Sequence, residues 1–85
     1  MKLLFRAVNE LLEITITKDY ELLGKGKLTG GADIPLKALA IKPTDKAMYS
    51  QVENKLRALK TDEERKNYVI SECRKAGLEF IKVIE

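Results

Sequence analysis

The sequence predicts a single α+β domain over residues 1–85, an antiparallel sheet of three to five strands with a helical hairpin packed on one face. A β-branched, alternating run over residues 14–17 predicts a strand, and two amphipathic stripes between residues 44 and 76 predict consecutive helices. An apolar run over residues 78–84 then predicts a closing strand. The expected order is therefore β-β-β-β-α-α-β, and 85 residues are too few to build a second core.

The N-terminal segment has two interpretations. Apolar and polar side chains largely alternate over residues 2–8, which favours a strand, whereas a helical stripe over residues 2–12 fits almost as well. We prefer the strand, because Asn9-Glu10 suits a tight turn and the following segment, residues 11–17, is plainly β. Lys18-Asp19 then predicts a turn, and residues 20–23 a returning strand, so that the two runs form a hairpin.

Glycine and proline divide the middle of the chain. Gly24 and Gly26 suit a bent continuation of the returning strand, and Gly30-Gly31 predicts a turn. Residues 34–41 are mostly apolar, and a proline near their start is compatible with an edge strand. Pro43 is expected to stop that segment, which leaves Thr44 to cap the first helix.

The two helices are specified more clearly than the strands. The core-facing stripe of the first consists of Met48, Val52, Leu56 and Leu59. Thr61 and Glu64 have the spacing of a capping box, which predicts the start of the second helix, and Gly77 is its expected C′ residue. The core-facing stripe of this helix consists of Val69, Cys73 and Ala76.

The closing run over residues 78–84 has apolar residues on both faces, which predicts a strand well inside the sheet. Two helices with one apolar stripe each cover one sheet face. The apolar residues counted as too many for that face are Leu22, Leu23, Leu36, Leu39 and Ile81. The surplus predicts a protein partner or a homodimer.

Composition argues against catalysis. The chain has no histidine, which removes the commonest general base and the commonest metal ligand. Its one cysteine, Cys73, lies on an apolar stripe, which favours a buried hydrophobe over a nucleophile. We therefore expect no enzymatic activity, no metal and no cofactor. A single cysteine and the absence of a long apolar stretch favour a cytoplasmic protein without a membrane segment.

Two groups of residues are candidates for binding phosphate or nucleic acid. In the glycine-rich loop over residues 24–31 they are Lys25, Lys27 and Thr29. Around the corner between the two helices they are Lys55, Arg57, Lys60, Arg65 and Lys66. Exposed backbone N–H groups beside lysines bind anions, and clustered basic side chains meet nucleic-acid phosphates. The net charge of +3 permits nucleic-acid binding without requiring it.

The sequence thus leaves three hypotheses for function. The preferred one is a small non-enzymatic interaction module, a regulator or inhibitor that binds another protein. The second is a nucleic-acid-binding module that uses Lys25, Lys27 and the basic helix corner. The third is a binder of a small phosphorylated ligand or nucleotide through the loop over residues 24–31.

Overall fold

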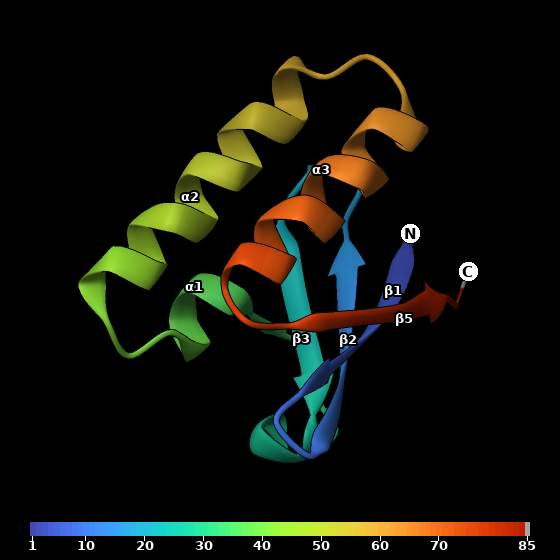
Figure 1. Ribbon diagram of the computed structural model, residues 1–85. Coiled ribbons are helices and arrows are strands. Elements are labelled where there is room, and N and C mark those ends of the chain that lie inside the picture. The colour runs from blue at the N-terminus through green and yellow to red at the C-terminus, as the bar shows by residue number, and fades with distance from the viewer. Residues whose placement is uncertain (85) are drawn as a thin grey trace.

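The computed structural model describes residues 1–84, which form a five-stranded antiparallel sheet with its helices packed on one face (Figure 1). The strands are β1 (Lys2–Ala7), β2 (Glu10–Ile16), β3 (Leu22–Gly26), β4 (Ile34–Pro35) and β5 (Glu79–Val83). The helices are η1 (Lys27–Thr29, a 3-10 turn), α1 (Leu36–Leu39), α2 (Pro43–Ala58) and α3 (Asp62–Lys75). The strand order is β4-β3-β2-β1-β5. The predicted fold class is confirmed, and the N-terminal segment is a strand.

The core lies between the sheet and the two long helices. Successive side chains of a strand point to opposite faces, so β1 directs Leu3 and Phe5 to the helices while their neighbours face outward. The buried apolar residues of the sheet are Leu3, Phe5, Ile14, Ile16 and Leu22, and those of the helices are Leu36, Val52, Leu56, Val69 and Cys73. Burying one such aliphatic or aromatic side chain stabilises the fold by about 1.5–3 kcal/mol.

The two long helices begin in different ways. At α3 the predicted capping box is present, since Thr61 Oγ1 accepts from Glu64 N at 3.1 Å and Glu64 Oε1 accepts from Thr61 N at 3.1 Å. The prediction that Thr44 caps the first helix is wrong, because α2 begins at Pro43 and its N-cap residue is Lys42, two residues before Thr44. Proline suits the first helical position, where its missing N–H would have no partner and its φ is already helical.

The segment over residues 34–41 is a strand only at its start. Ile34 and Pro35 pair with β3, and the chain then turns into α1, whose Leu36 is buried. Gly24 makes this approach possible: a Cβ at that position would lie 2.6 Å from Leu36 Cδ2 and 3.2 Å from Leu39 Cδ1. Gly24 therefore lies in β3, as predicted, and its missing side chain leaves room for α1 to pack against the strand.

The closing strand lies at the edge of the sheet, so the prediction that it lies well inside is wrong. Among the described residues, β5 has β1 as its one neighbouring strand. Phe80 enters the core, where its ring contacts Phe5 edge-on at 5.5 Å between centroids, while Ile81 and Val83 remain 37% and 43% exposed. An apolar run indicates that side chains of a strand are buried, but it does not indicate whether the strand has one neighbouring strand or two.

The sheet face that carries no helices is mainly polar. Glu13 lies opposite Lys25 across β2 and β3, and Arg6 faces Glu79 at 3.7 Å across β1 and β5. Of the surplus counted from the sequence, Leu22 and Leu36 are buried, and Leu23 and Leu39 are half-buried. Within residues 1–84, no helix is long and apolar enough to cross a membrane.

Candidate interaction surfaces

The glycine-rich loop is held together by its own hydrogen bonds. Thr29 Oγ1 donates to the Gly26 carbonyl at 2.9 Å and accepts from Gly26 N at 3.0 Å. The N–H groups of Gly30 and Gly31 donate to the carbonyls of Lys27 and Gly26. Three backbone donors that a phosphate would need are therefore engaged inside the loop, and an anion site here would rest on the lysine side chains.

The basic residues of the helix corner are dispersed. Lys55, Arg57 and Lys60 are exposed, while Lys66 forms an ion pair with Glu63 at 3.0 Å. The corner and the glycine-rich loop lie at opposite ends of the molecule (Figure 1). The two groups of basic residues predicted from the sequence therefore do not form one continuous surface.

Arg65 faces inward, where it closes the end of α2. Its Nε and Nη2 donate to the carbonyls of Leu56 and Leu59 at 3.0 and 2.5 Å, and Nη1 lies 3.1 Å from Asp62 Oδ1. The last carbonyls of a helix lack intrahelical partners, so the guanidinium satisfies two of them. The Arg65 Cζ also lies 4.4 Å from the ring centroid of Tyr20, and this contact joins α3 to the β2–β3 turn. This predicted phosphate ligand has a structural role in the described fold.

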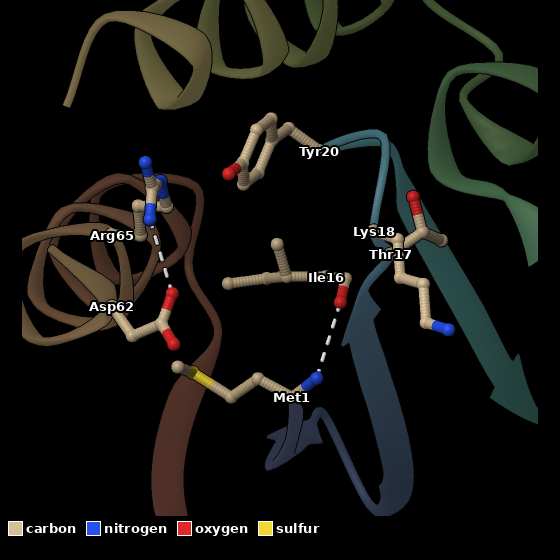
Figure 2. Close-up of a pocket in the computed structure, with 7 residues that line it drawn as sticks. All are labelled: Met1, Ile16, Thr17, Lys18, Tyr20, Asp62 and Arg65. Atoms are coloured by element: carbon tan, nitrogen blue, oxygen red, sulfur yellow. Dashed lines mark hydrogen bonds and ion pairs between the residues drawn. The ribbon is translucent and has the colours of Figure 1, made fainter. Parts of the chain in front are cut away.

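An open cleft of about 320 Å³ lies beside this arginine (Figure 2). Its lining residues are Met1, Ile16, Thr17, Lys18, Tyr20, Asp62 and Arg65. Figure 2 shows Asp62 and Arg65 on one side of the cleft and the β2–β3 turn on the other. The Met1 amino group donates to the Ile16 carbonyl at 3.2 Å. Protein acceptors engage all three nitrogens of the Arg65 guanidinium, so an anion in the cleft would depend on Lys18 and on the remaining donors of the Met1 amino group.

Glu53 is a buried carboxylate that the sequence analysis did not single out. Its Oε2 accepts from the backbone N–H of Leu22 at 2.9 Å, and Oε1 lies 3.3 Å from Lys37 Nζ. The residue is 3% exposed, so both oxygens are used within the fold. Because the Glu53 carboxylate fastens α2 to the start of β3, we assign it a structural role.

Cys73 is an inert thiol in this fold. The side chain is buried in the core, and burial, with a smaller contribution from the charge of Glu72, raises the pKa of the Cys73 thiol to about 12. The thiolate is the nucleophilic form, so the reactive species is suppressed near neutral pH. In residues 1–84, no three His, Cys, Asp or Glu side chains gather where they would hold a metal ion.

Exposed apolar side chains gather instead at the β1–β2 end of the sheet. Val8 is 90% exposed, Leu11 54% and Leu28 87%. Leu12 and Leu28 line two open hollows of about 160 and 50 Å³. Leu11 lines the smaller one, as does Ala7, which Val8 directly follows in the chain. We call Val8, Leu11, Leu28 and the two hollows the apolar end; it lies opposite the α2–α3 corner (Figure 1).

The backbone conformation of Val8, in the apolar end, is strained. Val8 and Asn9 form the two-residue connection between β1 and β2, and Val8 has a φ of 58°. A positive φ at the first central residue alone is the type II′ arrangement, in which glycine is usual. A β-branched residue is unfavourable in this region by about 1–2 kcal/mol. The exposed Val8 side chain makes no core contact that offsets the strain.

No family model, curated protein or solved structure matches the chain. Function must therefore be inferred from the surface of residues 1–84. Of its features, the apolar end combines exposed apolar side chains, adjoining hollows and a strained turn.

Proposed function

We propose that the protein is a small non-enzymatic interaction module that binds another protein through the apolar end. The observation that carries the proposal is the exposure of Leu28, which stands between two hollows and is 87% exposed. Contiguous exposed apolar surface on a folded domain is typical of sites that bind other proteins.

The energetics favour a partner that covers Leu28 and Val8 together. Full burial of one such side chain is worth about 1.5–3 kcal/mol, so these two residues would supply the centre of an interface. Glu10, Lys27 and Asp45 line the hollows and provide charges of both signs around the apolar residues. An apolar centre with a polar rim is the usual anatomy of a protein–protein interface.

We propose further that the module is a regulator or inhibitor, because a bound module would cover a surface of its partner and so change what that partner can bind. The activity of a captured partner, measured with and without this chain, tests that role. The buried thiol of Cys73 needs no oxidising compartment, which supports a cytoplasmic setting.

The test is comparative capture from the host's own extract with three immobilised forms of the chain. They are the wild type, Leu28→Asp and Ile41→Asp; Ile41 is 93% exposed and lies outside the apolar end, so it is a matched control. We expect wild type and Ile41→Asp to retain the same protein and Leu28→Asp to lose it.

Equal capture by all three forms would contradict the proposal, provided that circular dichroism shows each to be folded. Nucleic acid retained at low salt by every form, and released as salt rises, would favour the nucleic-acid hypothesis instead. A thermal shift with nucleotides, absent with the protein partner, would favour the phosphorylated-ligand hypothesis.

A further inference from the structure

Among residues 1–84, β5 pairs with β1 alone, so its other edge has no neighbouring strand. An edge strand leaves alternate N–H and C=O groups without a partner strand, and such an edge is a template for pairing. Ile81 and Val83 of β5, and Ile84 directly after it, are 37–43% exposed. The opposite edge is β4, which has two residues and includes Pro35, so it offers little for pairing.

A bulge gives β5 an unusual distribution of charge. Lys82 pairs with Leu4 and Glu79 pairs with Arg6, and the register shifts between these two pairs. Leu4 and Arg6 share the sheet face without helices, so Glu79 and Lys82 also point to that face although they are three residues apart. In a regular strand, residues three apart would point to opposite faces.

This arrangement makes β5 complementary to itself in one antiparallel register. If a two-fold axis passes between Phe80 and Ile81, Glu79 lies opposite Lys82 of a second copy, and Lys82 lies opposite its Glu79. The same register places Val83, which pairs with Leu3, opposite Leu78, which directly precedes β5 and packs against the core. Shifting the register by one residue in either direction sets side chains of opposite faces against each other, and the charges lose their partners.

We propose that β5 pairs with β5 of a second copy of this chain, which would join two five-stranded sheets into one. The charges and the bulge of β5 oppose pairing with an arbitrary strand. A second copy of β5 that runs antiparallel carries the same bulge and places an opposite charge against each of these residues. The dimer would leave the apolar end free, so the proposal does not depend on the proposed function. A single strand pair buries less than a stable interface, so we expect weak, concentration-dependent association.

Sedimentation equilibrium over a series of protein concentrations tests the dimer with two charge variants. Lys82→Glu sets glutamates opposite each other at both symmetric positions, and Glu79→Lys does the same with lysines. We expect each variant alone to dimerise about tenfold or more weakly than wild type. An equimolar mixture restores both opposite-charge pairs, so we expect it to associate like wild type.

Amide hydrogen exchange identifies the surface used. Protection of β5 that increases with protein concentration would support strand pairing, whereas concentration-dependent protection confined to the apolar end would overturn it. A wild type that remains monomeric at millimolar concentration would also overturn the proposal, as would a mixture no better associated than either variant alone.

Discussion

Replacing Glu53 by alanine tests how the helical layer is held to the sheet. The change removes the acceptor of the Leu22 N–H and leaves that donor buried, which costs about 1–3 kcal/mol. The ion pair with Lys37, whose side chain is 47% exposed, adds less than about 1 kcal/mol. We expect a total loss of about 2–3 kcal/mol from the free energy of unfolding.

That loss is large for a chain of 85 residues, whose free energy of unfolding is expected to be roughly 4–13 kcal/mol. It corresponds to a fall in Tm of about 8–24 °C, since one kcal/mol shifts a domain of this size by about 4–8 °C. The assay is thermal and urea unfolding followed by circular dichroism.

Glu53→Gln is the matched control, because an amide oxygen still accepts the Leu22 N–H while the charge is lost. We expect it to cost less than half as much as alanine. The reasoning is refuted if Glu53→Ala unfolds within about 0.5 kcal/mol of wild type, or if glutamine and alanine are equally destabilising.

Three further changes test other contacts. Gly24→Ala places a Cβ against Leu36, so we expect a loss of about 1–3 kcal/mol in urea unfolding; an unchanged midpoint would contradict the packing of α1. Arg65→Lys loses the two-carbonyl cap and the contact with Tyr20, so Tm should fall, whereas Arg57→Lys should leave Tm within error. The pKa of the Cys73 thiol is about 12 when folded and 9.0 for a solvent-exposed thiol, so above pH 9 the unfolded chain loses a proton that the folded chain keeps. The free energy of unfolding should therefore fall more steeply with pH in wild type than in Cys73→Ala, and equal slopes would contradict the burial of the thiol.

The elements that the sequence predicted correctly depend on local interactions. The Thr61–Glu64 capping box and the end of α3 before Gly77 involve residues a few positions apart, so spacing alone identifies them. A turn and a clear strand after residues 2–8 favour a strand over a helix there, and β1 and β2 do pair through a two-residue turn. That turn is centred on Val8 and Asn9, one residue earlier than Asn9-Glu10.

The errors arise where distant parts of the chain decide the outcome. Whether β5 is central or at an edge depends on the order of all five strands, which its own apolar pattern does not contain. A proline such as Pro43 is common both after the end of one segment and at the first position of a helix. Only the structure around it shows that Pro43 is the first residue of α2.

The candidate site was harder to predict than the fold for the same reason. Arginine and glutamate are residue types that usually lie at the surface, yet Arg65 of α3 and Glu53 of α2 face backbone groups of other elements. The apolar end joins Val8 from the β1–β2 turn, Leu11 from the start of β2 and Leu28 from η1, and no single stretch of sequence displays it.

The claim that the apolar end is a binding surface is tested most directly by Val8→Gly, measured for both stability and partner capture. Glycine removes the strain of φ 58°, worth about 1–2 kcal/mol, and costs about 0.5–1 kcal/mol of backbone entropy. No packing is lost, because the side chain is 90% exposed. We predict a free energy of unfolding raised by about 0.5–1 kcal/mol together with weaker capture of the partner. Unchanged capture by the more stable variant would contradict the claim.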